Sequence, residues 1–447
     1  MDGSSLFSRT PLIELPMAVA GEGCRIVDSE GKRYLDACGG AAVSCLGHSA
    51  QPVIDAIKAQ LDSIAFAHTS FFTSEPAEAL ARLLIERAPE GLERVYFLSG
   101  GSEANEAAMK LARQYALESG QPDRSFIIAR AQSYHGNTLG ALSAGGNQWR
   151  RKPFEPLLSP AMRHIAPCHY WRYAEPGESP EAYSKRSADA LETEILALGP
   201  ERVAAFIAEP VVGATLGAVA ATPGYFKRIR EICDRYGVLL ILDEVMCGMG
   251  RTGTLFASEQ EGISPDIVCI AKGLGAGLQP IGAMLASGKI YETIKGGSGF
   301  FQHGHTYVGH PTACAAGVAV IETIEKQGLL ERVQARGETL LAALRERFAD
   351  HPHIGDVRGR GLFLGVELVE DRESKSALAP ERKVATRIKA EAMSGGLMCY
   401  PMSGSVDGLL GDHVLLAPPF IIEQPEIDEI VDKLAGAIDR ALAANAG

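Results

Sequence analysis

The strongest constraint on the fold is a series of short apolar runs separated by segments long enough to form helices. The runs are Val95–Leu98, Phe126–Ala129, Val203–Ala208, Val238–Leu242 and Ile267–Ala271. Strands that are covered on both faces read as continuous apolar runs, and two parallel strands need a long crossover between them. The alternation therefore predicts an α/β domain built around a mainly parallel sheet.

The two ends of the chain follow a different pattern. Two β-like runs near the N-terminus, Arg25–Asp28 and Arg33–Asp36, are joined by residues typical of a turn, which predicts a hairpin. The C-terminal part has glycine-rich strands, an amphipathic helix near Glu381–Met393 and a closing helix near Gln424–Ala443. We expect a smaller α+β domain there. The expected division is a large domain of residues 61–325 and a small domain of residues 1–60 and 326–447.

Composition limits the classes of function. The chain has 447 residues, with 43 Lys and Arg against 55 Asp and Glu, and a formal net charge of −12 at pH 7. This acidic balance argues against a surface that binds nucleic acids or anionic membranes. The 9 cysteines are scattered singly, and no apolar run approaches the roughly 18 residues of a membrane span. We therefore expect a cytoplasmic protein without disulfide bonds.

Candidate functional residues follow the apolar runs, because open α/β sheets bind ligands at the carboxyl ends of their strands. The segment Ser99–Glu106, "SGGSEANE", is a glycine turn that opens a helix. Free backbone N–H groups at such a helix start can form a phosphate cradle. Glycine turns are common, so this segment alone does not establish a phosphate site.

Asp243 follows the run Val238–Leu242 and is open to other interpretations. A carboxylate at a strand end can simply cap the next helix. The segment "VLLILDE" also resembles the Walker B strand of ATPases. The chain has no Gly-x-x-x-x-Gly-Lys-[Ser/Thr] loop, however, which argues against an ATP site of the P-loop type.

Lys272 lies in "CIAKGLGAG", between an apolar run and a glycine-rich loop. A lysine at a strand end often only keeps its charge in water. Where apolar walls disfavour the charged form, the amine instead becomes a nucleophile that can form a Schiff base with a carbonyl group. The neighbouring candidate residues decide between these two interpretations.

A metal site is not expected. His303 and His305 lie in "FFQHGHTYVGHP" and could in principle ligate a metal. No cysteine or carboxylate near them in the sequence completes a coordination set.

Taken together, the strand-end residues match what pyridoxal phosphate needs. The requirements are a phosphate cradle, an aromatic residue that stacks on the ring, a carboxylate that keeps the pyridine nitrogen protonated, and a lysine. Tyr134, in "SYHG", supplies the aromatic residue, and Asp243 and Lys272 supply the other two side chains. Lys272 would form the Schiff base and then shuttle a proton, a contribution to the rate of roughly 10²–10⁴-fold.

The order of motifs resembles the class III pyridoxal-phosphate aminotransferases, the ω-amino-acid and amine transaminases. The motifs are Gly-Ser-Glu-Ala-Asn, Tyr-His-Gly, Ala-Glu-Pro, Leu-Asp-Glu-Val, Ala-Lys-Gly and Gly-His-Thr-Tyr-x-Gly-His-Pro. The resemblance runs from "EGKRYLD" to "LLAPPF" and so covers essentially the whole chain. It implies the fold type I architecture and a homodimer with two active sites at the subunit interface, with tetramers as a further option.

The resemblance also implies a role for each matching residue. Lys272 is the Schiff-base lysine, and Asp243 is the partner of the pyridine nitrogen. The backbone of Gly101 and Ser102 holds the phosphate. The other assignments are Tyr134 stacked on the ring with His135 beside it, Val245 on the other ring face, Glu209 near the cofactor hydroxyl, and Thr306 reaching the phosphate of the partner subunit.

The chain departs from the family pattern in one region. Relatives that use pyruvate or 2-oxoglutarate commonly carry an arginine shortly before Ala-Pro-Pro, where it binds the acceptor carboxylate. Residues 405–416 contain no arginine or lysine in this chain. Another cation would have to replace it, and Arg150 and Arg151 are the candidates. Small residues in "GGAAVSCLGHS" further predict a roomier donor pocket than in amine-selective relatives.

We therefore expect an aminotransferase that moves an amino group from an ω-amino acid or amine to pyruvate or 2-oxoglutarate by a ping-pong mechanism. Decarboxylating transaminases and aminomutases of the same fold use the same lysine and aspartate, so they stay open as alternatives. A non-catalytic regulator that binds pyridoxal phosphate is a remoter alternative, since it would need an added DNA-binding module.

Overall fold

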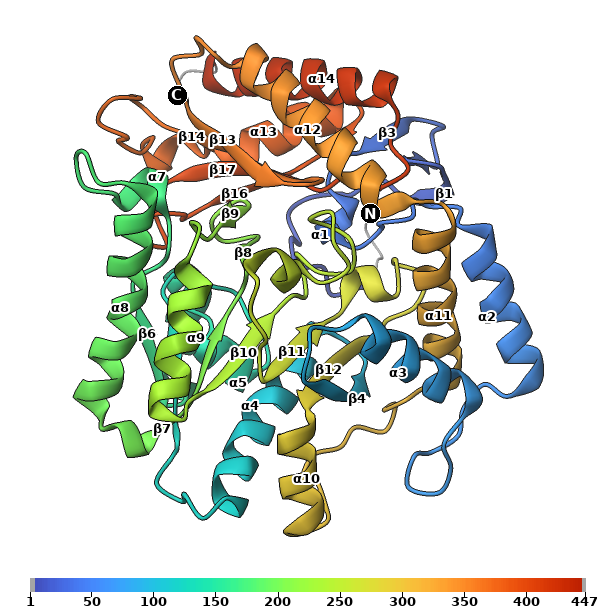
Figure 1. Ribbon diagram of the computed structural model, residues 1–447. Helices are drawn as coiled ribbons and strands as arrows, with labels where there is room; N and C mark the ends of the chain where they lie inside the picture. Colours follow the sequence, from blue (N-terminus) through green and yellow to red (C-terminus); the bar gives the residue numbers. More distant parts are fainter. Residues whose placement is uncertain (1–4, 444–447) are drawn as a thin grey trace.

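The protein is built on a seven-stranded sheet with helices on both faces (Figure 1). A computed structural model describes residues 5–443. In spatial order the strands are β4 (Leu92–Leu98), β12 (Gly282–Ser287), β11 (Ile267–Ile270), β10 (Leu239–Asp243), β7 (Val203–Ala208), β5 (Phe126–Arg130) and β6 (Met162–Ile165). Strand β12 is antiparallel to both of its neighbours, and the other adjacent pairs are parallel. Each of the five apolar runs forms one of these strands, which confirms the predicted α/β sheet.

The strands are apolar throughout because alternate residues face helix layers on opposite sides of the sheet. On β7, Phe206 packs into a core with α8 (Pro180–Leu198) and α9 (Tyr225–Tyr236). The next residue, Ile207, packs into the core on the other face, together with α4 (Gly101–Glu118). Both faces of the sheet are thus filled by packing, and the strand ends are left for binding.

The other long helices follow the predicted pattern closely. They are α2 (Gln51–Ser63), α3 (Glu75–Arg87), α10 (Gly288–Gly296), α11 (Pro311–Lys326), α12 (Leu329–Arg347), α13 (Val384–Ser394) and α14 (Gln424–Ala443). Helix α13 begins three residues later than expected, because Pro380–Arg382 form a separate 3₁₀ turn before it. Four shorter helices are α1 (Gly39–Ala42), α5 (Leu139–Ala144), α6 (Gln148–Arg151) and α7 (Tyr170–Tyr173).

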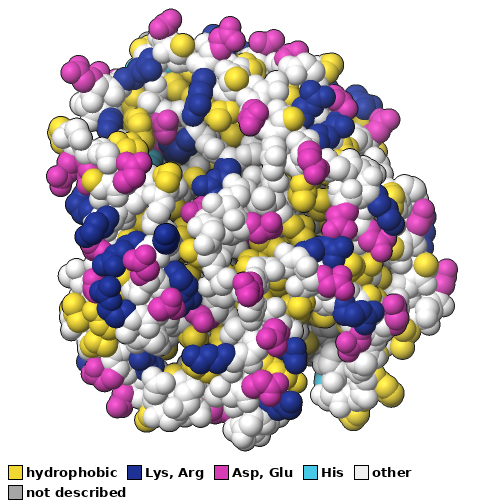
Figure 2. Space-filling model, in the orientation of Figure 1, with side chains coloured by type: hydrophobic (Ala, Val, Ile, Leu, Met, Phe, Trp, Pro, Cys, Tyr) yellow, Lys and Arg dark blue, Asp and Glu magenta, His cyan; other side chains and the backbone are white. Residues whose placement is uncertain are grey.

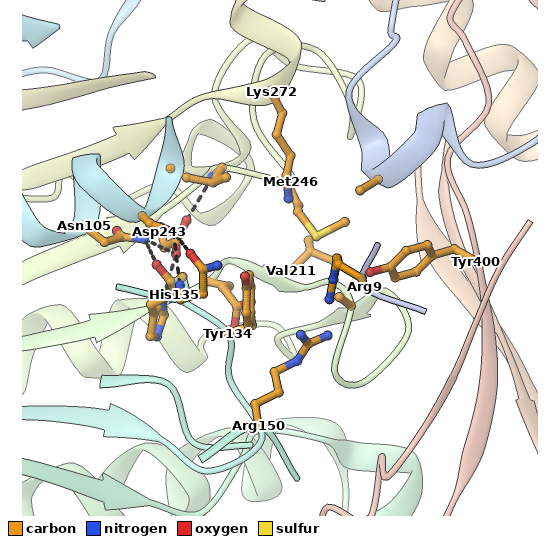
Figure 3. A pocket seen from close by; sticks show the side chains of 18 residues that line it. Arg9, Asn105, Tyr134, His135, Arg150, Val211, Asp243, Met246, Lys272 and Tyr400 are labelled. Atoms are coloured by element: carbon orange, nitrogen blue, oxygen red, sulfur yellow. Dashed lines mark hydrogen bonds and ion pairs between the residues drawn. The ribbon is translucent and has the colours of Figure 1, made fainter. Parts of the chain in front are cut away.

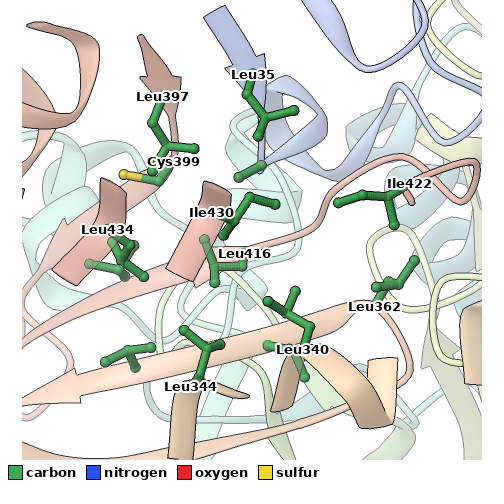
Figure 4. Close-up of a cluster of buried hydrophobic side chains, with 14 of the residues drawn as sticks. Leu35, Leu340, Leu344, Leu362, Leu397, Cys399, Leu416, Ile422, Ile430 and Leu434 are labelled. Carbon is green, nitrogen blue, oxygen red and sulfur yellow. The ribbon is translucent and has the colours of Figure 1, made fainter. Parts of the chain in front are cut away.

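The C-terminal part forms a second sheet covered by helices, above the central sheet in Figure 1. Its strands are antiparallel, in the order β13 (Ile354–Arg360), β14 (Phe363–Leu368), β17 (Asp412–Leu416) and β16 (Tyr400–Ser403). Leu340 and Leu344 of α12 pack with Leu416 of β17 and with Ile430 and Leu434 of α14 (Figure 4). This core supports the predicted α+β character of the region.

The N-terminal hairpin joins the C-terminal part. Strands β1 (Ala18–Glu22), β2 (Arg25–Asp28) and β3 (Arg33–Asp36) are antiparallel, which confirms the predicted hairpin, and β15 (Leu397–Met398) pairs in parallel with β3. Leu35 accordingly shares a core with Leu397 and Leu434. This pairing supports the assignment of the N-terminal segment to the small domain, although residues 1–4 and 444–447 lie outside the described part and the division at residues 61 and 325 stays a prediction.

The face shown in Figure 2 carries basic and acidic side chains side by side rather than one large field of either sign. Arg228, for example, contacts the carboxylates of Asp189, Glu192 and Glu231 within 3.4 Å. All 9 cysteines are buried and free of disulfide bonds. Within residues 5–443, no helix is both long enough and apolar enough to cross a membrane.

Candidate active site

A cavity of about 390 Å³ lies at the carboxyl ends of β10 and β11, beside β16. Residues from distant parts of the sequence reach into it from several sides (Figure 3). The predicted site residues that line it are Gly101, Ser102, Tyr134, His135, Glu209, Asp243, Val245 and Lys272. The structure thus brings these predicted residues together in one cavity, and their individual roles stay predictions.

Lys272 comes two residues after the end of β11, and its backbone has a φ of 49°. This left-handed conformation is uncommon for a residue with a side chain, and the surrounding structure must offset its cost. Burial lowers the pKa of Lys272 to about 8, although the carboxylates of Asp243 and Glu209 act in the opposite direction. About half of this amine is therefore neutral at pH 8, which is the form a nucleophile requires.

Asp243 is the last residue of β10, and its carboxylate is held by three hydrogen bonds. The side-chain amide of Asn105 donates to Oδ2 over 2.7 Å, and Nδ1 of His135 lies 2.8 Å from the same oxygen. The backbone N–H of Val245 donates to Oδ1 over 3.0 Å. These contacts fix the orientation of a buried carboxylate beside the cavity. Residues 245–250 form turns, so Asp243 does not cap a helix directly after β10.

The start of α4 forms the candidate phosphate cradle. Its cap residue, Gly100, makes no side-chain hydrogen bond, so the first-turn N–H groups at Gly101 and Ser102 are available to an anion. A Cβ atom on Gly101 would lie 2.6 Å from a methyl carbon of Val245, which explains the glycine at this position. The hydroxyl of Ser102 accepts the backbone N–H of Asn137 over 3.1 Å and so closes the cradle on one side.

Tyr134 and Glu209 occupy other walls of the cavity. The partly buried ring of Tyr134 has the guanidinium of Arg150 at 4.7 Å from its centroid. Glu209 follows β7 and is buried, and burial raises the pKa of its carboxyl group to about 7. Its Oε2 atom has no hydrogen-bond partner among the described residues. Glu209 is therefore able to be neutral and to donate a hydrogen bond into the cavity.

Thr306 is the one predicted site residue that does not line this cavity. It is exposed, in the loop that joins α10 to α11. The role that its motif implies is at the cofactor of another subunit. Its contribution stays a prediction.

The two arginines offered as substitutes for the missing carboxylate-binding residue behave differently. Arg150 lines the cavity, whereas Arg151 turns away and donates to the backbone carbonyls of Leu142, Ser143 and Gly145. Arg151 is therefore committed to holding the backbone. His303 and His305, for their part, belong to no group of potential metal ligands within residues 5–443.

Several lining residues were not among the predicted site residues, and Arg9, Asn105 and Tyr400 are three of them. The sequence could have predicted Asn105, because it lies four positions after Gly101 on the same helix and positions four apart share one face. Arg9 comes from an exposed N-terminal segment and Tyr400 from β16. No local pattern marks either of these two, because only the tertiary fold brings them to the cavity.

Comparisons with known proteins agree with this architecture. The family model for class-III aminotransferases matches residues 11–438. An uncharacterized aminotransferase of Schizosaccharomyces pombe is 46% identical over 443 residues, which cover 98% of this chain and 96% of that protein. An (S)-enantioselective ω-transaminase from Thermomicrobium roseum superposes with a TM-score of 0.91 and 38% identity, covering 97% of this chain and 94% of that one.

A PMP-bound aminotransferase from Vibrio fluvialis also superposes with a TM-score of 0.91, at 33% identity, covering 99% of this chain and 97% of the other. The expected fold type I architecture is thereby confirmed. The family match spans the central sheet, the cavity residues and the C-terminal sheet alike. The chain belongs to the class III aminotransferases.

Proposed function

We propose that this aminotransferase uses pyridoxal phosphate to move an amino group from an ω-amino acid or amine to pyruvate or 2-oxoglutarate. The observation that carries the proposal is the buried amine of Lys272, which shares one cavity with the carboxylate of Asp243 and the open start of α4. The PMP in the Vibrio fluvialis relative and the ω-transaminase from Thermomicrobium roseum support the same chemistry.

The residues around the cavity fit this cofactor. The first-turn N–H groups of α4 would receive the phosphate. Asp243 would hold the proton on the pyridine nitrogen, because Asn105 and His135 already fix its carboxylate. The orphaned Oε2 of Glu209 would find a partner on the hydroxyl side of the ring. The flat pyridine ring would then lie between the side chains of Tyr134 and Val245.

When bound, pyridoxal phosphate withdraws electrons from the substrate Cα and makes its C–H bond acidic. When neutral, Nζ of Lys272 would take the proton from the substrate Cα. The same nitrogen would later give this proton back from the same side of the cavity. Asp243 maintains the positive charge that makes this withdrawal effective. The amino group left by the first substrate then passes to the 2-oxo acid, so the two substrates use the cavity in turn.

Steady-state rates test this proposal. With an ω-amino acid or amine as donor, we expect parallel lines in double-reciprocal plots against the 2-oxo acid, and one amino acid formed for each donor consumed. Carbon dioxide released in step with donor consumption would instead identify a decarboxylating enzyme. A donor panel of ω-amino acids, diamines and aryl-alkyl amines that gives no amino acid product would contradict the proposal.

The lowered pKa of Lys272 predicts an unusual pH dependence of its reactivity. In cofactor-free protein, reductive methylation by formaldehyde needs the neutral amine, so methylation of Lys272 should be half-maximal near pH 8 and level off above it. Exposed Lys227 on α9 is the reference site in the same sample. Peptide mass spectrometry reads both sites at once. A pH profile at Lys272 that matches the one at Lys227 would show that the cavity does not shift Lys272.

An internal control comes from Asp243, whose negative charge raises the pKa of Lys272. Replacing it in Asp243→Asn should therefore move the methylation midpoint of Lys272 to lower pH. A midpoint that moves upward would contradict the arrangement of charges in the cavity.

We also propose a homodimer with a shared active site. Large apolar side chains are exposed near Thr306, and such patches mark protein–protein contacts. Tyr307 is 60% exposed and its ring lies against Phe66, whose segment continues to Phe71 and Phe72 at 78% and 68% exposure. A stable dimer in sedimentation experiments at micromolar protein is the expected result.

Within such a dimer, Thr306→Val should weaken cofactor binding. A hydrogen bond to a charged phosphate contributes about 1.5–3 kcal/mol, so the Kd for pyridoxal phosphate should rise about 10–100-fold. Absorbance titration of cofactor-free protein measures this Kd, and sedimentation checks that the dimer persists. An unchanged Kd in an intact dimer would remove Thr306 from the site.

We further propose a cytoplasmic location. All 9 cysteines are buried as thiols without disulfide bonds, and disulfide bonds are rare in reducing compartments. Cell fractionation with an antibody against the chain tests this assignment, and recovery with secreted proteins would contradict it.

A further inference from the structure

Arginines and carboxyl groups both line the cavity besides the amine of Lys272. The arginines are Arg9 and Arg150, and the acidic residues are Glu209 and Asp243. Asp243 is already in contact with His135. Burial raises the pKa of Glu209 to about 7, which reduces the negative charge that it can offer. A cavity with this balance suits a substrate that brings an anionic group with it.

Arg150 is the cation best placed to meet that group. It reaches into the cavity from the side opposite Lys272, and its guanidinium lies over the ring of Tyr134 (Figure 3). Within residues 5–443 it forms no ion pair, and its buried Nε has no hydrogen-bond partner. Buried donors in native proteins are normally satisfied, so the guanidinium of Arg150 has a donor to offer to an acceptor in the cavity.

Other arginines of the chain have acceptors for their guanidinium groups. Arg151 donates to three backbone carbonyls. Arg172 and Arg358, both largely buried, pair with the carboxylate of Glu367. Arg150 lines the cavity and has no anionic partner among the described residues. Arg9, which also lines the cavity, comes from the exposed N-terminal segment.

Arg150 also lies close to the C-terminal loop from which a basic residue is missing. The loop between β16 and β17, residues 404–411, contains no lysine or arginine. This loop rests on α6, the helix that carries Arg150: a Cβ atom on Gly408 would lie 2.8 Å from Cβ of Gln148 and 2.9 Å from the backbone nitrogen of Trp149. Arg150 on α6 thus lies next to the loop that lacks a basic residue.

We propose that Arg150 binds the carboxylate of the 2-oxo acid acceptor, and of any amino-acid donor, as a replacement for the missing loop arginine. The inference rests on the proposed transaminase function. A guanidinium offers two parallel N–H donors that match a carboxylate, and the ring of Tyr134 holds its plane in place. Because Arg150 would pair with a carboxylate, substrates that carry a carboxylate should be preferred, and amines without one should bind more weakly.

Binding of unreactive ligands to the cofactor-loaded enzyme tests this inference. Propanoate carries the carboxylate but cannot react, and propanamide is its uncharged counterpart. The loaded enzyme is used because its phosphate cradle is occupied, so propanoate cannot bind there. By calorimetric titration, Arg150→Gln should bind propanoate about 10–100-fold more weakly than the natural protein, with binding of propanamide unchanged.

Two further variants sharpen the result. Lys152→Gln removes the same charge two residues away on an exposed side chain outside the cavity and should bind propanoate as the natural protein does. Arg150→Lys keeps the charge but not the planar pair of donors, so its affinity should fall between the two. In turnover, Arg150→Gln should raise KM for the 2-oxo acid far more than it lowers kcat.

Equal affinity of Arg150→Gln and the natural protein for propanoate would overturn the inference, whatever the turnover shows. The same holds if Lys152→Gln weakens binding as much as Arg150→Gln does. Because the readout is binding of an unreactive ligand, it is separate from the proposed function. If the natural enzyme turned over no amino donor, the transaminase proposal would be contradicted. Binding of propanoate would still decide whether Arg150 forms an anion site.

Discussion

Replacing Lys272 by alanine is expected to lower turnover by about 10³-fold or more while leaving the fold intact. Proton transfer by a positioned side chain contributes roughly 10²–10⁴-fold, and this variant also removes the only amine placed for covalent attachment among the residues that line the cavity. A buried, poorly solvated amine does not stabilise the fold by itself. The midpoint temperature of thermal unfolding should therefore stay the same or rise in Lys272→Ala. Turnover with a reactive donor and acceptor pair is the measurement.

The matched control is Lys227→Ala, which removes a lysine from the exposed face of α9 and should keep full activity. Added methylamine offers a second check, because a small free amine in the vacated space should restore part of the proton transfer. Turnover of Lys272→Ala within about tenfold of the natural enzyme would refute the role of Lys272, since it would be smaller than the weakest acid–base contribution expected.

Asp243→Asn is expected to reduce turnover by about 10²–10⁴-fold. Removing one partner of a buried charge pair costs about 3–5 kcal/mol, which corresponds to that range of rate. The neutral amide also loses the charge that holds Nδ1 of His135 and the amide of Asn105 in place. Single-turnover rates with a donor in excess measure the effect on the chemical step separately from substrate binding.

Asp266→Asn is the control for this prediction. Asp266 directly precedes β11, so it lies at the amino ends of the strands, opposite to the cavity, where it pairs with Arg230. The same change of carboxylate to amide there should alter stability but leave the rate of the chemical step within a few-fold. If Asp243→Asn were as active as Asp266→Asn, the carboxylate at the cavity would have no part in the reaction.

Much of the site could be predicted from the sequence because the responsible rule is local. Asp243 and Lys272 each stand directly after an apolar run, and parallel strands bring such positions to one edge. The antiparallel strand β12 was harder, since Gly282–Ser287 continues a glycine-rich loop and has no distinctive period. Arg9 and Tyr400 were out of reach, because their place at the cavity depends on contacts between distant parts of the chain.

The choice between Arg150 and Arg151 shows where local reasoning stops. Adjacent residues on a helix point about 100° apart. Arg150 can therefore face the cavity while Arg151 faces the carbonyl groups of residues 142–145. Which one does so depends on how α6 docks against the loop at Gly408 and the carbonyls near Leu142. Thr306 poses the same problem on a larger scale, because its expected ligand belongs to another subunit.

The most informative single measurement is the visible absorption of the cofactor-loaded protein during the two half-reactions. Adding an ω-amino acid or amine without acceptor should convert the pyridoxal band to that of the PMP form, and pyruvate or 2-oxoglutarate should restore it. Lys272→Ala should show neither change at a comparable rate. A natural protein that binds pyridoxal phosphate but undergoes no reversible conversion with any donor would contradict amino-group transfer through this cavity.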